Sequence, residues 1–150
     1  MKNLRSLGII LAVLVSFVVL WMMVYVSGGT LAGVFDLPTL GGLLLCFPAL
    51  FVSGYSKDFR NAVMITFCDI DFSDKELERA EKSCTLLLKA LWLESLLFTI
   101  IGLIGLCNNI DDHEFIGANI AVSLLPLLYG AFVSLGIIAV RGSVESKRCL

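Results

Sequence analysis

Four long apolar runs set the strongest limit on what this chain can fold into. The hydrocarbon core of a bilayer is about 30 Å thick, and a helix needs roughly 20 apolar residues to cross it. The four runs occupy residues 7–26, 37–52, 86–107 and 115–140. The second run is short unless residues 31–35 extend it, and the third contains Lys89 and Glu94. The sequence therefore predicts an all-α membrane protein with four transmembrane helices.

Composition favours the same class. Of the 150 residues, 58% are hydrophobic and 16% are charged, whereas roughly a quarter of the residues in a soluble domain are charged. The mean hydropathy is +0.93. The formal net charge of −2 leaves no free basic stripe for a nucleic acid. Lipid is therefore the expected surrounding of most of the surface.

We expect one membrane domain over residues 1–150. Its spans are expected at about 7–26, 33–53, 87–107 and 114–140, with an interfacial helix and stalk at about 55–86 and a tail at 141–150. The first run also follows Lys2 and Arg5, as a signal peptide would. Its length exceeds the usual 7–15 apolar residues and no small-residue cleavage site follows it, which favours an uncleaved first helix.

The basic residues predict the direction of the spans. Ten of the eleven lie before the first run, between the second and third, or after the fourth, and Lys89 lies at the start of the third. The connections around Asp36 and at residues 111–114 carry acids and no Lys or Arg. Because Lys and Arg accumulate on the cytoplasmic side, both termini are expected to be cytoplasmic and the acidic connections to face outward.

A cytoplasmic helix is expected to lead directly into the third span. Ser73 and Glu76 have the spacing of a capping box, and Glu78 precedes Lys82 by four residues, the favourable order for a helical ion pair. No helix breaker occurs from residue 74 to residue 101. One continuous helix should therefore project two to three turns into the cytoplasm as a stalk. Before it, apolar and polar residues alternate between 57 and 67, as in a short helix at the headgroups.

Several polar and small residues lie inside the third and fourth spans. Ser95 and Thr99 are four residues apart, as are Asn119 and Ser123, so each pair shares a helix face. Such hydroxyl and amide groups either line a hydrophilic path or hold helices together, and both interpretations stay open. Glycines that allow close helix packing are found at Gly102, Gly105 and Gly130.

Glu94 is the one acid expected within the third span. An intramembrane carboxyl group often marks a functional site. It is also close to the cytoplasmic headgroups, where it could extend to water or pair with Lys89 despite the awkward spacing of five residues. The residues leave these alternatives open.

No enzyme, metal or cofactor site is predicted. The five cysteines (Cys46, Cys68, Cys84, Cys107 and Cys149) lack Cys-x-x-Cys spacing, and His113 is the one histidine. The acids at 111, 112 and 114 beside His113 could attract a metal, but an Asp that caps the fourth helix is the simpler interpretation. No nucleophile triad or phosphate-binding loop is present in the sequence.

Three sequence blocks resemble the MotA/TolQ/ExbB family, and within it a shortened MotA-type flagellar stator subunit. "GGTLAGVFDLPTL" at 28–40 is similar to the family's connection between the first two spans. "TIIGLIGLCNNIDD" from Thr99 resembles the third span, and "IGANIAVSLLPLLYGAF" from 116 resembles the fourth. The blocks occur in the family's order.

The resemblance implies an A-type subunit in a bacterial inner membrane. Five copies would surround two single-span helices of a MotB/ExbD-like partner, and protons or sodium ions crossing at the partner's acid would drive rotation. Thr99 matches the family threonine, so Thr99 and Ser95 would face the pore, with Asn119 and Ser123 as further candidates for the ion pathway.

The sequence also departs from the family. Only about thirty residues separate the second and third spans, where flagellar members have a loop of roughly a hundred. Pro126 and Leu127 stand at the paired threonines of the fourth span. The alternative function is therefore a non-conducting membrane scaffold that keeps the fold without ion transport or rotor contact. A weaker third possibility is an ordinary four-span accessory protein.

Overall fold

The computed structural model describes residues 36–68, 72–108 and 116–148, together with six residues of the first apolar run. These six are helical, namely Leu14, Val15, Val18, Trp21, Met22 and Tyr25. The Trp21 and Tyr25 rings stack with their centroids 6.3 Å apart. Most of the first expected span, the connection at 27–35 and the acidic connection at 111–114 lie outside the described residues.

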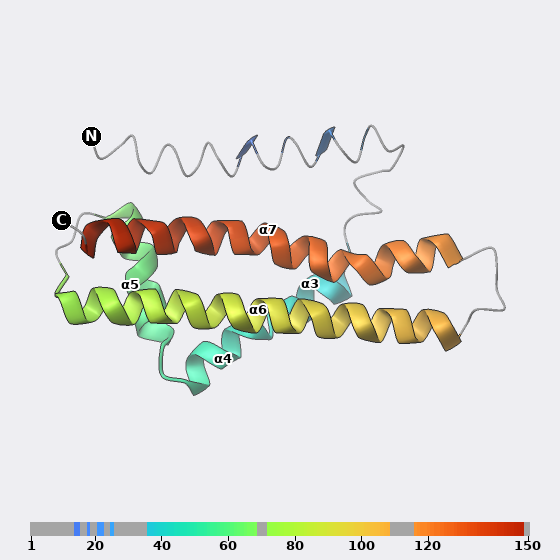
Figure 1. The fold of residues 1–150 in the computed structure, drawn as a ribbon, viewed down its shortest axis with the longest axis horizontal. Coiled ribbons are helices and arrows are strands. Elements are labelled where there is room, and N and C mark those ends of the chain that lie inside the picture. The colour runs from blue at the N-terminus through green and yellow to red at the C-terminus, as the bar shows by residue number, and fades with distance from the viewer. Residues whose placement is uncertain are drawn as a thin grey trace.

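All regular elements of the described ranges are α-helices, as the apolar runs predict. Figure 1 shows two long helices, α6 and α7, lying side by side and antiparallel, with three shorter helices packed against them. The elements are α3 (Leu37–Leu43), α4 (Cys46–Val52), α5 (Ser56–Phe67), α6 (Asp74–Asn108) and α7 (Ile116–Arg148).

Both α6 and α7 are long and apolar enough to cross a membrane. A third span exists if the bent pair of Thr39–Val52 and Ser56–Phe67 counts as one. The class of an α-helical protein with membrane-type helices is therefore confirmed. The number of four spans and their direction stay predictions.

The continuous helix predicted from residue 74 is present as α6, which runs unbroken for 35 residues. We keep the name stalk for its beginning, whose projection into the cytoplasm stays a prediction. At 1.5 Å per residue it is about 52 Å long, more than a bilayer core requires. At its start the backbone N–H and the hydroxyl of Ser73 both donate to one carboxylate oxygen of Glu76, at 2.9 and 2.8 Å. Farther along, Lys82 Nζ lies 2.7 Å from Glu78 Oε1. The local interactions expected from sequence spacing are thus formed.

The short second run is broken into α3 and α4 at Leu44 and Leu45. Pro48 explains the position of the break, because a proline ring clashes with the carbonyl four residues earlier, here that of Leu44. That carbonyl instead accepts a hydrogen bond from the N–H of Phe47 at 3.2 Å. The two helices and the break between them span 16 residues, from 37 to 52, which is short for a full crossing.

After α4 the chain turns sharply into α5. The axes of the two segments differ by 108°, and Gly54 at the turn has a φ of +75°, a left-handed conformation that glycine adopts without strain. α5 crosses behind α6 and α7, near the ends where α6 begins and α7 stops (Figure 1). Asp58 is 7% exposed and faces Arg79 of α6, with Oδ2 3.4 Å from Nε. This arrangement matches a helix that lies across the stalk rather than parallel to it.

The core lies where α5, the stalk and the end of α7 meet. Buried apolar residues of α6 follow one another at intervals of three and four, the pattern of a helix that packs along one stripe. They are Leu77, Ala80, Cys84, Leu87 and Leu91. α7 contributes Ile137 and Val144, and Ala62 and Ile65 come from α5. At this end Glu81 joins α6 to α7 by ion pairs, since its carboxylate lies 3.2 Å from both Arg141 and Arg148 of α7.

Candidate functional site: the polar seam between α6 and α7

The buried stripe of α6 changes its chemistry as it enters the apolar half of the helix. After Leu91 the same spacing of four continues with Ser95, which is fully buried, and Thr99, which is 5% exposed. On α7 the buried residues include Ser123, Gly130 and Ser134. We call Ser95, Thr99, Gly102, Ser123, Gly130 and Ser134 the polar seam. Small and hydroxylated residues replace leucine here, as is typical of helix contacts within membranes.

Two glycines of the seam face two serines across the helix pair. A Cβ added to Gly130 would overlap the Ser95 hydroxyl and lie 2.9 Å from the Ser95 Cβ. A Cβ added to Gly102 would lie 2.8 Å from the Ser123 hydroxyl and 3.0 Å from its Cα. Real Cβ atoms do not approach other heavy atoms so closely. The absence of a side chain at both glycines is therefore what lets α6 and α7 pack together.

Three hydroxyls of the seam donate hydrogen bonds within their own helix. Ser95 donates to the Leu91 carbonyl at 2.8 Å, Thr99 to the Ser95 carbonyl at 2.9 Å, and Ser123 to the Asn119 carbonyl at 2.7 Å. This bonding to the carbonyl four residues earlier satisfies the donor inside an apolar environment. The oxygen lone pairs remain able to accept a further bond.

Ser134 also lies on the buried stripe of α7, although the sequence by itself does not identify it. The residue is 3% exposed, and its buried hydroxyl has no hydrogen-bond partner among the described residues. Ser134 follows Gly130 by four residues and Gly130 follows Ser123 by seven, which is the spacing of one helix face. The sequence does not tell which face of α7 meets α6, so by spacing alone the serine could equally face lipid.

Other predicted site residues lie off the seam. Asn119 is exposed in the first turn of α7, and Gly105 has no atom within 4 Å of an added Cβ. Pro126 is buried within an α7 that stays continuous. The structure thus brings Ser95, Thr99 and Ser123 together with Gly102 and Gly130, and leaves Asn119 and Gly105 outside.

Glu94 points toward the break between α3 and α4. Its carboxyl meets the backbone N–H of Cys46, the first residue of α4. Its Oε2 atom is buried and has no hydrogen-bond partner among the described residues. The alternative, an ion pair between Glu94 and Lys89, is not formed in the structure. Because the break removes the usual helical partner of the Cys46 N–H, the acid acts as a substitute acceptor for it.

Asp36 lies beside the middle of α7. Its backbone N–H donates to the Tyr129 phenol oxygen at 3.0 Å, and its carboxylate accepts a bond from the Thr39 hydroxyl. Tyr129 follows Ile116 by thirteen residues, about 20 Å along the helix. That this connection faces outward stays a prediction. The contact itself joins residues 93 apart in the chain, so no local sequence pattern specifies it.

No group of three or more metal-ligating side chains occurs among the described residues. The acids around His113 lie outside those residues, so a metal site formed by them is not tested by the structure. No protein-family model, no curated protein and no solved structure matches this chain. The fold and seam by themselves define a class, a helical membrane-type protein built around a closely packed α6–α7 hairpin.

Proposed function

We propose that this protein is the A-type subunit of an ion-driven membrane assembly. In this proposal it forms a homopentamer in a bacterial inner membrane, with four spans and cytoplasmic termini, around a dimer of a single-span B-type partner. The supporting observation is that the two blocks resembling the family's third and fourth spans meet each other along the polar seam, with Ser95 against Gly130 and Gly102 against Ser123.

The surface that remains exposed also fits an assembly. Large apolar side chains cover the outer faces of α6 and α7 beyond the stalk. Examples with at least 45% exposure are Trp92, Leu93, Leu96, Leu97, Ile100, Ile101 and Ile104. Such a surface suits lipid or further copies of the subunit.

A second candidate function, a non-conducting scaffold, is favoured by one specific observation. Ser95, Thr99 and Ser123 are at most 5% exposed within the single chain. Under the ion-transport proposal these hydroxyls must turn to a central axis when the partner binds. Under the scaffold proposal they hold α6 and α7 together as they are.

Mass and ion flux separate the two. The 16.3 kDa chain, purified in detergent, should have the mass of five copies, measured by light scattering. A monomer would contradict both the motor and the pentameric scaffold. Reconstituted with its B-type partner, the pentamer should carry protons into vesicles, followed with a pH-sensitive dye. A pentamer that carries none would leave the scaffold as the function.

Thr99→Ala tests the role of one hydroxyl. Under the transport proposal the variant should lose coupled flux while it keeps the pentameric mass. Under the scaffold proposal its effect should be limited to about 1 kcal/mol of interhelical stability. Thr66→Ala is the matched control, because Thr66 makes the same type of bond, to the Ala62 carbonyl at 3.0 Å, on α5.

A further inference from the structure

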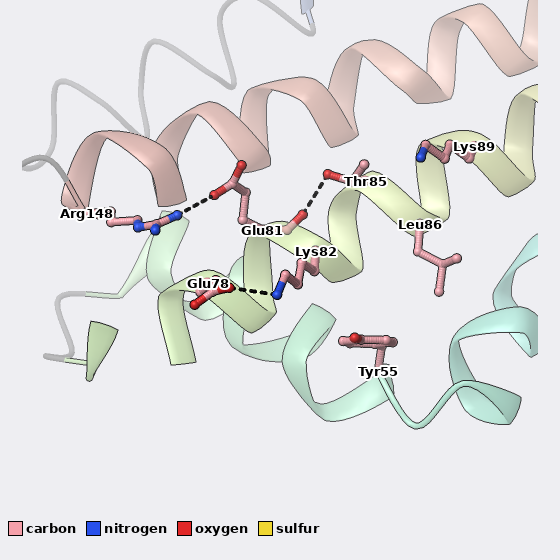
Figure 2. Close-up of a pocket in the computed structure, with 8 residues that line it drawn as sticks. All are labelled: Tyr55, Glu78, Glu81, Lys82, Thr85, Leu86, Lys89 and Arg148. Atoms are coloured by element: carbon pink, nitrogen blue, oxygen red, sulfur yellow. Dashed lines mark hydrogen bonds and ion pairs between the residues drawn. The ribbon is translucent and has the colours of Figure 1, made fainter. Parts of the chain in front are cut away.

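A cavity of about 440 Å³ lies between the start of α5, one face of α6 and the end of α7. Figure 2 shows Tyr55, the N-cap residue of α5, below this face of α6, and Arg148 approaching from α7. The residues that line it from α6 are Glu78, Glu81, Lys82, Thr85, Leu86 and Lys89. Their spacing of three and four residues places them on one side of the helix. The polar seam contributes no residue to this cavity.

The cavity lies where the surface of α6 changes from charged to apolar. Charged residues dominate α6 before Leu86, and beyond it Lys89 and Glu94 are the only charged residues of the helix. If α6 crosses a bilayer, this level is that of the headgroups. Tyr55 fits the same level, because tyrosine accumulates at membrane–water interfaces.

The charges that line the cavity are unevenly paired. Lys82 is paired with Glu78 at 2.7 Å, and Arg148 with Glu81 at 3.2 Å. Glu81 also holds Arg141 at 3.2 Å, so its carboxylate is shared by two cations. Lys89 is exposed and forms no ion pair with a described residue. The cavity therefore presents an ammonium group without a protein counter-ion.

The remaining groups suit a phosphate attached to an apolar molecule. The Tyr55 phenol makes no hydrogen bond to a described residue, so its O–H is available as a donor. The Thr85 hydroxyl already donates to the Glu81 carbonyl at 3.0 Å and can only accept. Leu86 and the Tyr55 ring provide apolar contact beside the two donors.

We propose that this cavity binds the phosphate group of an anionic phospholipid from the cytoplasmic leaflet. Lys89 contacts the phosphate, and Tyr55 and Leu86 contact the glycerol and the beginning of an acyl chain. A lipid is favoured over a soluble phosphate because the apolar part of the cavity, at Leu86 and the Tyr55 ring, continues into the exposed apolar surface of α6. A zwitterionic headgroup would bring its own ammonium toward Lys89, Lys82 and Arg148, so an anionic headgroup is preferred. The site depends on α6 crossing the membrane and not on ion transport or on the number of subunits.

Native mass spectrometry of the detergent-purified full chain tests the site. Phosphatidylglycerol and phosphatidylcholine of equal chain length are added in parallel, and the fraction of protein with one bound lipid is measured. The wild type should retain more phosphatidylglycerol. Lys89→Ala should lower this retention by about fivefold, the effect expected of one basic residue near an anionic headgroup. Lys89→Arg should retain most of it.

Lys75→Ala is the matched control, because Lys75 is an exposed lysine of the same helix that does not line the cavity. Equal losses in Lys75→Ala and Lys89→Ala, or equal retention of the two lipids by the wild type, would overturn the proposal. In a further arm, inorganic phosphate is added at millimolar concentration. If it displaces phosphatidylglycerol in a Lys89-dependent way, the ligand is a soluble phosphate and the lipid assignment is wrong. Lipid retention by a protein that is not pentameric would count against the proposed function alone.

Discussion

The backbone N–H of Asp36 donates a 3.0 Å hydrogen bond to the phenol oxygen of Tyr129, joining the start of α3 to the middle of α7. The two residues belong to the first and third blocks that resemble the stator family. Asp36 is the N-cap residue of α3, so its backbone N–H has no acceptor within that helix and needs an acceptor from another part of the protein. Tyr129 supplies it, so the acidic connection is tied to the helix hairpin.

Replacing Tyr129 with Phe should therefore weaken the attachment of α3. The change removes the acceptor and leaves the Asp36 N–H unsatisfied at a half-buried position, which should cost about 1 kcal/mol or more. Thermal unfolding in detergent measures the effect. Tyr25→Phe is the control, since the Tyr25 side chain is 75% exposed. Identical unfolding temperatures for the two variants would contradict the role given to Tyr129.

The close approach of Ser95 and Gly130 gives a second prediction. Gly130→Ala would force its Cβ into the Ser95 side chain, and overpacking of this kind costs about 1–3 kcal/mol. Gly136→Ala on the same helix meets no atom within 4 Å and should be neutral or slightly stabilising, because alanine favours helix. The unfolding temperature in detergent again provides the comparison.

Adding Ser95→Gly to Gly130→Ala supplies the internal check. The exchange moves the small residue to the opposite helix and should restore part of the lost stability. If Gly130→Ala is as stable as Gly136→Ala, the helices are not packed as closely as the seam requires.

The beginning of the stalk should respond to pH through Glu76. The backbone N–H of Ser73, and then its hydroxyl, hold the pKa of the Glu76 carboxyl below its usual value of 4.5. A pKa lowered by folding means that the contribution to helix stability is present above about pH 4.5. It is lost as the pH falls through the lower, folded pKa.

Carboxyl NMR titration and amide hydrogen exchange at residues 74–78 measure this behaviour. Ser73→Ala removes the hydroxyl bond and should move the Glu76 pKa partway back toward 4.5. Glu76→Gln keeps an acceptor but cannot titrate, so its exchange rates should show no step in this pH range. A wild-type Glu76 that titrates as it does in an unfolded chain would refute the assignment.

The cysteines offer a test of topology. Cys68 and Cys107 are exposed, whereas Cys46 and Cys84 are buried. Burial also raises the pKa of the Cys84 thiol to about 11, which keeps it protonated and unreactive at neutral pH. In variants that retain one cysteine each, a membrane-impermeant maleimide should modify Cys68 only from the cytoplasmic side and Cys107 only from the opposite side.

The variant that retains Cys84 is the control for burial and should stay unmodified from both sides until detergent and denaturant are added. Modification of Cys68 and Cys107 from the same side would refute the prediction that α6 crosses the membrane between these two cysteines. It would leave the packing of the seam itself untouched.

The break in the second run shows how far sequence reasoning extends. Pro48 predicts a kink because a proline ring excludes the carbonyl four residues before it, and the structure has the break at Leu44 and Leu45. The acceptor that completes the broken backbone is Glu94, some fifty residues later. Its pairing with the Cys46 N–H depends on the rotation of α6 about its axis, which no local pattern specifies.

The hydroxyls of the spans show the same limit. Spacing of four residues placed Ser95 and Thr99 on one face, and that face is now seen to be buried against α7. Spacing alone left open whether the face lines a path or packs against a helix, because both need the same residues. Asn119 has the same spacing from Ser123, yet it is exposed while Ser123 is buried.

The sequence by itself determined those features that depend on interactions between residues within about one helix turn of each other. The apolar lengths, the continuous α6, the Ser73–Glu76 cap and the Glu78–Lys82 pair all follow from spacings of three or four residues and from the absence of breakers. Tertiary structure alone decided the pairs Asp36–Tyr129, Ser95–Gly130 and Glu81–Arg141. Each of these depends on the relative rotation and shift of two helices, and those are set by the whole packed surface rather than by any short stretch of chain.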